Sequence, residues 1–239
     1  MSGRGQIAAL APALAGALIL PGAAAAQGLC RMALLLALDV SSSVDAGEDR
    51  LQRTGLAAAL LSPAVTEALL SRPGAPVALA AYEWSGRYQQ KLLLDWRLIT
   101  APGALQDAAA TIRGSTRSHD EFPTALGYGL GYAAQVFRRA PDCLFRTLDV
   151  SGDGINNDGF GPALAYANFP LDGITVNALV IGGATAEDQA VFDYYSDEVI
   201  RGPGAFVETA QGYHDYEAAM RRKLERELRS RVIGALGER

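Results

Sequence analysis

The chain has few of the residues that carry nucleophilic and acid–base chemistry. Its 239 residues include only two cysteines and two histidines. The histidines, His119 and His214, have no nucleophile-elbow serine beside them, and no glycine-rich phosphate loop with a lysine is present. The sequence therefore predicts that the protein is not an enzyme.

Lysine is also scarce, because Lys91 and Lys223 are the only two in the chain. The formal net charge is −5, so the protein has no basic field that would attract nucleic acid. The basic run at residues 221–223 lies among glutamates, a pattern typical of a solvated helix face. We expect no nucleic acid among the partners.

Long hydrophobic runs are absent apart from residues 7–20, which are too few to span a membrane comfortably. This run follows a weakly basic start and precedes small residues that end at Ala26, which is typical of a signal peptide. An uncleaved anchor is the alternative. We expect a signal peptide at residues 1–26 and a single domain at residues 27–239. The mature protein should have no transmembrane segment and should be periplasmic or secreted.

The most informative motif is Asp39-Val-Ser41-Ser-Ser43, which follows an apolar run at residues 32–38 with the features of a buried strand. Ligands in open α/β sheets bind outside the carboxyl ends of the strands. One carboxylate and two hydroxyls at alternate positions offer hard oxygen ligands, which suit Mg²⁺ or Ca²⁺ rather than zinc or copper. Alternatively, the aspartate caps a helix and the serines satisfy loop backbone groups.

Two further segments carry oxygen side chains at comparable places. Thr124 opens a predicted helix, and Asp153 follows a predicted strand at residues 144–150. Together with the first motif they resemble the metal-ion-dependent adhesion site of von Willebrand factor type A domains. The resemblance implies a divalent cation, Mg²⁺ or possibly Mn²⁺ or Ca²⁺, held directly or through water by Asp39, Ser41, Ser43, Thr124 and Asp153.

The resemblance covers most of the chain, from about Cys30 to Leu228. It is closest to an uncharacterised bacterial family of secreted type A-like proteins, whose sites also have the sequences Ser-Gly-Asp-Gly and Glu-Trp-Ser-Gly. The chain departs from better-known type A domains at Ser151-Gly152, where a threonine is commoner.

Strands alternate with helices along the chain, which favours a mostly parallel sheet covered on both faces. A turn at residues 85–87 makes one strand antiparallel. The predicted fold is α/β and doubly wound, with one antiparallel edge strand and helices on both faces. The predicted strands are residues 32–38, 77–84, 88–96, 144–150, 173–181 and 205–207. The main predicted helices are residues 45–60, 101–113, 124–139, 159–169, 186–199 and 213–236.

A haloacid dehalogenase-type phosphatase is the alternative activity, because residues 152–158 also resemble the last motif of that class. Asp39 would then be the nucleophile, but Ser41 stands where such enzymes have a general acid. Neither lysine lies where the phosphate-binding cation is expected. Thr124 has no role in that mechanism.

A metal-dependent protein-binding module fits the motifs better. A cation with an open coordination place can bind an Asp or Glu of a partner protein, so that it bridges two acidic surfaces. A structural envelope protein with a vestigial site is a third hypothesis. The predicted turn at residues 85–87 should lie beside the metal, which makes Glu83, Trp84 and Tyr88 candidate rim contacts for the partner. Alternatively, Trp84 lies in the core.

The two cysteines, Cys30 and Cys143, should form a disulfide in an oxidising compartment. They precede Asp39 and Asp153 by similar distances along the chain, so both should lie at the amino ends of neighbouring strands. Strands about 4.8 Å apart suit the Cα spacing that a disulfide needs. Two buried free thiols are the alternative.

Overall fold

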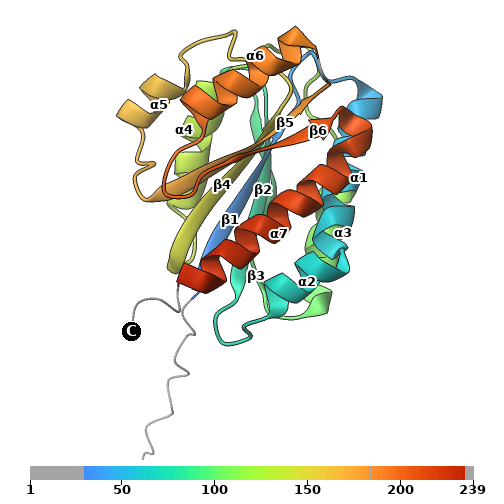
Figure 1. Ribbon diagram of the computed structural model, residues 1–239, viewed down its shortest axis with the longest axis vertical. Helices are drawn as coiled ribbons and strands as arrows, with labels where there is room; N and C mark the ends of the chain where they lie inside the picture. The colour runs from blue at the N-terminus through green and yellow to red at the C-terminus, as the bar shows by residue number, and fades with distance from the viewer. Residues whose placement is uncertain (1–29, 184, 235–239) are drawn as a thin grey trace, which may run out of the picture.

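The computed structural model describes residues 30–183 and 185–234, and the predicted signal peptide lies outside them. A six-stranded sheet forms the middle layer (Figure 1). Its order is β3-β2-β1-β4-β5-β6, and all neighbours are parallel except β2 and β3. The strands are β1 (Cys30–Asp39), β2 (Val77–Trp84), β3 (Gln90–Ile99), β4 (Cys143–Gly152), β5 (Ile174–Gly182) and β6 (Val207–Gln211). The predicted fold class is confirmed.

Helices cover both faces of the sheet (Figure 1). One face carries α1 (Ala46–Leu61), α2 (Pro63–Leu70), α3 (Pro102–Arg113) and α7 (Tyr216–Gly234). The other carries α4 (Leu126–Phe137), α5 (Pro162–Asn168) and α6 (Ala186–Tyr194), which continues as a π-helical turn, Tyr195–Val199. Two hydrophobic cores therefore lie on either side of the sheet.

The central strand β1 explains this layering, because every one of its residues is buried. Leu34 and Leu36 face the core under α1 and α7, while Ala33 and Leu35 face the core under α4. The chain leaves β1 toward one side of the sheet for β2 and later returns on the other side for β4. The carboxyl ends of β1 and β4 thus form a topological switch point, where open α/β sheets bind ligands.

Local sequence signals set several helix boundaries. Asp45 caps α1 by accepting hydrogen bonds from the backbone N–H groups of Gly47 and Glu48, and the Glu48 carboxylate accepts one from the Asp45 N–H. This is the predicted capping box. Helix α4 begins two residues later than expected, because Ala125 has a non-helical backbone (φ −103°, ψ 66°).

The carboxyl-terminal third differs most from the prediction. Strand β6 occupies residues 207–211 rather than 205–207, and the predicted helix at residues 186–199 changes to π geometry at Tyr195. Helix α7 was expected to expose its basic run, but Lys223 is fully buried against the sheet. Among the described residues, no helix is both long and apolar enough to cross a membrane.

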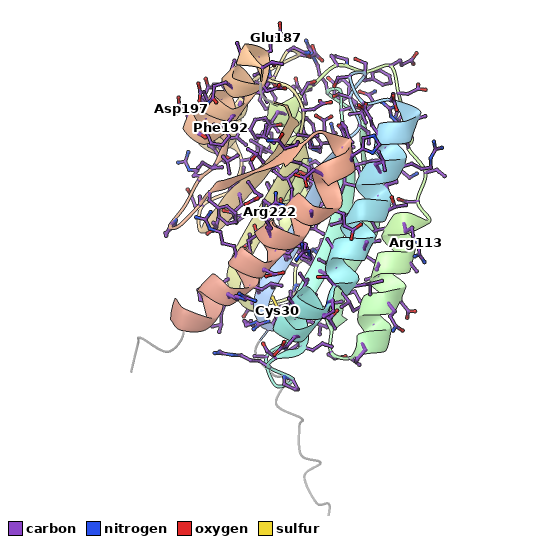
Figure 2. The ribbon with its side chains drawn as sticks, turned by 45° about the vertical axis from the view of Figure 1, so that its right-hand side comes forward. Cys30, Arg113, Glu187, Phe192, Asp197 and Arg222 are labelled. Carbon is purple, nitrogen blue, oxygen red and sulfur yellow. A yellow bond between two sulfur atoms is a disulfide. The ribbon has the colours of Figure 1, made fainter. Side chains whose placement is uncertain are left out.

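The predicted disulfide between Cys30 and Cys143 is confirmed (Figure 2). The two residues are register partners on β1 and β4, with Cα atoms 4.3 Å apart. In the same register Ala37 pairs with Val150. Asp153 therefore lies one residue beyond the level of Asp39, because Cys30 precedes Asp39 by 39 − 30 = 9 residues and Cys143 precedes Asp153 by 153 − 143 = 10.

Candidate metal site

Asp39 ends β1 and is fully buried at the carboxyl edge of the sheet. Its Oδ1 accepts a hydrogen bond from the Ser41 N–H at 2.8 Å. Its Oδ2 is buried and has no hydrogen-bond donor among the described residues. A buried carboxylate oxygen normally has a partner, so this atom is suited to a cation.

A chain of hydroxyl contacts joins Asp39 to Asp153 across the switch point. The Oγ atoms of Ser41 and Ser43 lie 3.1 Å apart, and Ser43 Oγ donates to Asp153 Oδ1 at 2.8 Å. Ser41 is buried, whereas Ser43 is exposed. The oxygen cluster therefore runs from the interior to the surface, where a second molecule can approach it.

Thr124 reaches the same place from the loop before α4. Its N–H donates to Asn157 Oδ1 at 2.9 Å, and its carbonyl accepts from the Asn157 N–H at 3.0 Å. Its Oγ1 lies 3.8 Å from the position of a Cβ on Gly154, next to Asp153. The structure thus brings the five predicted side chains to one edge, and their role as metal ligands stays a prediction.

The electrostatics at this edge favour a cation. Burial, followed by repulsion from Asp153, raises the pKa of Asp39 to about 8, although the Ser41 N–H and the charge of Arg117 act in the opposite direction. Within the described part of the chain, no three His, Cys, Asp or Glu side chains form a metal-binding group. The donor set is two carboxylates and three hydroxyls, which fits a hard divalent cation.

Arg117 is a site residue that the sequence analysis missed. Its guanidinium, from the loop between α3 and α4, donates to the carbonyls of Val40 (2.9 Å), Ser41 (2.8 Å) and Val44 (2.7 Å). These bonds fix the backbone that carries the two serines. Nothing in a lone arginine within a polar loop would have identified this role.

Two tyrosines behind the carboxylates were also missed. Tyr213, which follows β6, donates from Oη to Asp153 Oδ2 at 3.2 Å. Tyr195, in the π-helical turn, is fully buried. Burial raises the pKa of both phenols, and the charges of Asp39 and Asp153 raise it further. Both hydroxyls therefore stay protonated and can donate hydrogen bonds.

The predicted binding rim is wrong for Glu83 and Trp84, because both side chains are fully buried. Glu83 Oε2 accepts from Arg53 of α1 at 2.6 Å. Trp84 points to the opposite face, where its ring packs against Gly129 of α4. Both faces of β2 are covered by helices, so neither residue reaches the surface.

Tyr88 is the member of the predicted rim that is exposed, with 83% of its surface accessible. Its ring contacts Tyr128 edge-on, with centroids 6.1 Å apart. The neighbouring Arg87 forms an ion pair with Asp158 at 2.7 Å, which ties this hairpin to the loop that follows Asp153. Tyr88 therefore lies on the loop cluster that includes the candidate site.

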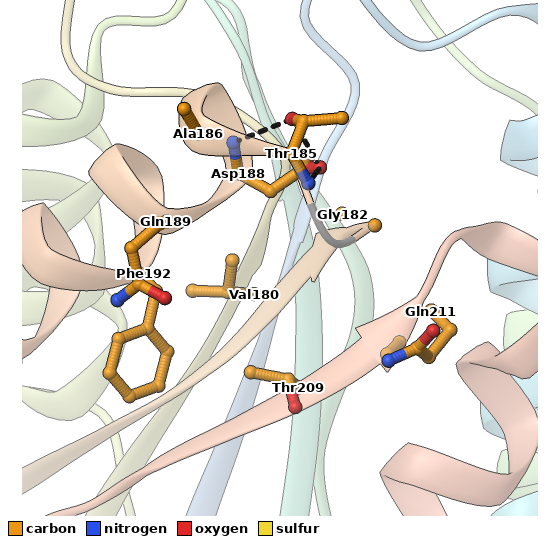
Figure 3. A pocket seen from close by; sticks show the side chains of 11 residues that line it. Val180, Gly182, Thr185, Ala186, Asp188, Gln189, Phe192, Thr209 and Gln211 are labelled. Atoms are coloured by element: carbon orange, nitrogen blue, oxygen red, sulfur yellow. Dashed lines mark hydrogen bonds between the residues drawn. The ribbon is translucent and has the colours of Figure 1, made fainter.

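A cavity of about 560 Å³ opens between α6 and the carboxyl ends of β5 and β6 (Figure 3). Phe192 and Gln189 of α6 face Thr209 of β6 across it. The polar groups at the start of α6 are already paired, since Asp188 accepts from the hydroxyl (2.6 Å) and the N–H (2.9 Å) of Thr185. None of the five candidate ligands lines this cavity.

Sheet order, layering and the position of the oxygen cluster together define a von Willebrand factor type A fold, and solved structures agree. The mussel byssus protein proximal thread matrix protein 1, solved "with zinc occupied MIDAS motif", has a TM-score of 0.61 and 16% identity over 85% of this chain and 49% of its own. A "von Willebrand factor type A" protein from Catenulispora acidiphila has a TM-score of 0.57 and 14% identity over 85% and 43%. The pilus adhesin SpaC from Lactobacillus rhamnosus GG has a TM-score of 0.60 and 12% identity over 85% and 31%.

The chain spans about half the length of the mussel protein and less of the other two. At these identities the likeness establishes the fold. The chain belongs to the family described as "Protein of unknown function (DUF1194)", whose model matches residues 29–232. No curated protein matches it.

Proposed function

We propose that this protein is a secreted or periplasmic, non-enzymatic binding module that holds a divalent cation and uses it to bind an acidic residue of a partner protein. The five oxygen side chains at the switch point would hold the cation, with Mg²⁺ the expected metal and Mn²⁺ or Ca²⁺ as alternatives. The open coordination place would accept an Asp or Glu carboxylate.

The free Oδ2 of Asp39 is the single observation that carries this proposal. This oxygen is buried, lacks a donor within the described residues and lies close enough to Asp153 for the two charges to repel. A purely structural role for Asp39 would leave this cost uncompensated. A cation at the same place would balance both carboxylates.

Two neighbours in fold support the proposal. The mussel protein was solved with a zinc-occupied MIDAS motif, so a divalent metal is bound there on the same type of fold. SpaC is a pilus adhesin. Both facts concern those proteins and make metal-dependent protein binding a reasonable expectation for this chain.

The phosphatase alternative receives no support from the positions of the lysines. Lys223 is buried and lies 2.7 Å from Asp149 and Glu227. Lys91 is exposed on the edge strand β3, two strands away from β1. A cation that could offset phosphate charge beside Asp39 is therefore not supplied by either lysine.

Metal titration followed by thermal unfolding tests the proposal. Millimolar Mg²⁺ or Mn²⁺ should raise the melting temperature of the purified protein, because a ligand of the native state adds about 2.7 kcal/mol of stability at 100 times its Kd. The substitution Asp39→Ala should abolish this gain. An unchanged melting curve for the wild type would reject the metal site and leave the vestigial-site hypothesis.

Affinity capture from an envelope extract tests the partner. The wild type should retain a protein in Mg²⁺ and release it in chelator, whereas Asp39→Ala should retain none. Hydrolysis of a generic phosphomonoester that is lost in Asp39→Ala would contradict the non-enzymatic function.

A further inference from the structure

Tyr195 carries a second buried polar atom without a partner beside the candidate metal site. Its Oη has no hydrogen-bond acceptor among the described residues, although the side chain is fully buried. Oη and Asp39 Oδ2 both lie against Gly152: a Cβ at that position would overlap the Tyr195 hydroxyl and stand 3.2 Å from Asp39 Oδ2. A hydrogen-bond donor and an acceptor, both without a partner, therefore lie next to the same glycine.

A second tyrosine, Tyr213, contacts the other carboxylate of the site, Asp153. Its hydroxyl donates to Asp153 Oδ2, while Ser43 donates to Asp153 Oδ1. Each aspartate of the site thus has one tyrosine hydroxyl behind it. Both tyrosines come from the carboxyl-terminal third of the chain, whereas the candidate ligands come from the end of β1, from the loops after β1 and β4, and from the loop before α4.

The backbone that carries Tyr195 is also unusual. Helix α6 ends at Tyr194, and residues 195–199 form a π-helical turn. Such turns are rare in proteins, and those that occur are often found at functional sites. Here the turn carries a phenol that is buried in the core on the α4 side of the sheet, with its hydroxyl against Gly152 at the end of β4.

We propose that Tyr195 and Tyr213 are positioning residues of the metal site, which act on the cation through Asp39 and Asp153. When the cation is bound, the Tyr195 hydroxyl donates to the free oxygen of Asp39, directly or through one water, whereas in the metal-free protein it has no acceptor among the described residues. The Tyr213 hydroxyl orients Asp153. Hydrogen bonds to ligating carboxylates fix their orientation, and their loss typically costs 10- to 100-fold in metal affinity. This inference rests on the proposed metal-binding function.

The substitutions Tyr195→Phe and Tyr213→Phe keep the rings and remove only the hydroxyls. Each should weaken Mg²⁺ or Mn²⁺ binding about 10-fold, measured by isothermal titration calorimetry. For Tyr195→Phe, the stability of the metal-free protein should be unchanged or higher, because an unsatisfied buried hydroxyl is lost. A loss of metal affinity without a loss of stability would not arise from a merely structural role.

Tyr216→Phe is the matched control. Tyr216 is also buried, and its hydroxyl bonds Ser151 Oγ at 3.0 Å rather than an aspartate. This variant should lose stability and keep the wild-type metal affinity. The inference is overturned if the wild type binds metal and both test variants bind within twofold of it, or if Tyr216→Phe weakens binding equally. A wild type that binds no metal overturns the proposed function as well, so the two failures are distinguishable.

Discussion

Asp149 and Glu227, in the core between β4 and α7, differ from Asp39 and Asp153 at the carboxyl edge in how their charge is balanced. The Lys223 ammonium lies 2.7 Å from Asp149 and 2.7 Å from Glu227, and all three side chains are buried. At the edge, Asp39 has one backbone N–H and a free oxygen.

Burial acts in the same direction on both aspartates. It is the main cause that raises the pKa of Asp149 to about 7 and that of Asp39 to about 8. For Asp149 the opposing charge comes from Lys223 of helix α7. For Asp39 the next basic group, Arg117, uses its N–H groups on backbone carbonyls. One acidic pair shares an ammonium from within the chain, although Asp149 Oδ2 and Glu227 Oε2 also lack a hydrogen-bond donor among the described residues. The other pair has no ammonium or guanidinium ion-paired with it among the described residues and is suited to an exchangeable cation.

Removing Lys223 should have the largest effect on stability, because it removes the internal counter-ion of Asp149 and Glu227. Lys223→Met leaves two buried carboxylates without a cation and should reduce the free energy of unfolding by about 3–5 kcal/mol in urea titrations. The control Arg222→Met changes an exposed residue on the same helix as Lys223. It removes ion pairs to Glu208 and Asp215 and should cost less than about 1 kcal/mol. Equal effects would show that Lys223 is not an internal counter-ion.

The pH dependence of the folding stability should show that Asp39, unlike Asp149, has no internal counter-ion. The folded pKa of Asp39, about 8, lies above the ordinary 3.8, so its contribution to stability is present at low pH and is lost as the pH rises to 8. In chelator, the wild type should therefore lose up to about 4 kcal/mol between pH 5 and pH 8 relative to Asp39→Asn, at about 1.4 kcal/mol per pH unit. Asp149 titrates in both proteins and cancels in the difference.

The same pH-dependent unfolding measurement, repeated with Mg²⁺, gives a second test of Asp39. The cation competes with the proton on Asp39, so the stabilisation that it gives should increase from pH 5 to pH 8 in the wild type and be absent in Asp39→Asn. Parallel pH profiles of the two proteins in chelator would contradict the raised pKa of Asp39.

Arg117→Ala should have an intermediate effect. Three carbonyls of the loop after β1 lose their donor, which should cost about 1–3 kcal/mol and weaken metal binding measured by calorimetry. Arg113→Ala, at the exposed end of α3 (Figure 2), is the control and should change stability by less than about 0.5 kcal/mol. A metal affinity unaffected by Arg117→Ala would mean that the loop holds its shape without this clamp.

The smallest effect on stability should come from Tyr88→Ala. This side chain is exposed, so unfolding should change by less than about 0.5 kcal/mol. If the proposed partner surface includes Tyr88, the Mg²⁺-dependent capture should decrease while metal binding stays intact. Undiminished capture would place the partner elsewhere around the site.

The sequence predicted the parts of the site that depend on strand ends. Asp39 and Asp153 follow apolar strands, and parallel strands bring their carboxyl ends together at one edge. Cys30 and Cys143 could be paired by the same argument from the opposite edge. These inferences needed only the period of the strands and the order of the elements.

The sequence could not predict contacts that depend on the path of a loop or on a helix far along the chain. Arg117, Tyr195 and Tyr213 reach the site by such routes, and no local pattern separates them from other polar or aromatic residues. Trp84 was named as a rim contact because it stands next to the predicted turn; the alternative placement in the core is the one the structure has, since β2 stays covered by helices up to its last residue. Lys223 was misplaced because its partner Asp149 lies on a distant strand.

The disulfide has a mechanical consequence. It joins β1 and β4 at their amino ends, while Asp39 and Asp153 lie at the opposite ends of the same two strands. A pulling force applied by a partner bound at the site would run lengthwise along both strands and reach a covalent bond. The bond would oppose any sliding of one strand past the other when the pull falls mainly on one of the two aspartates.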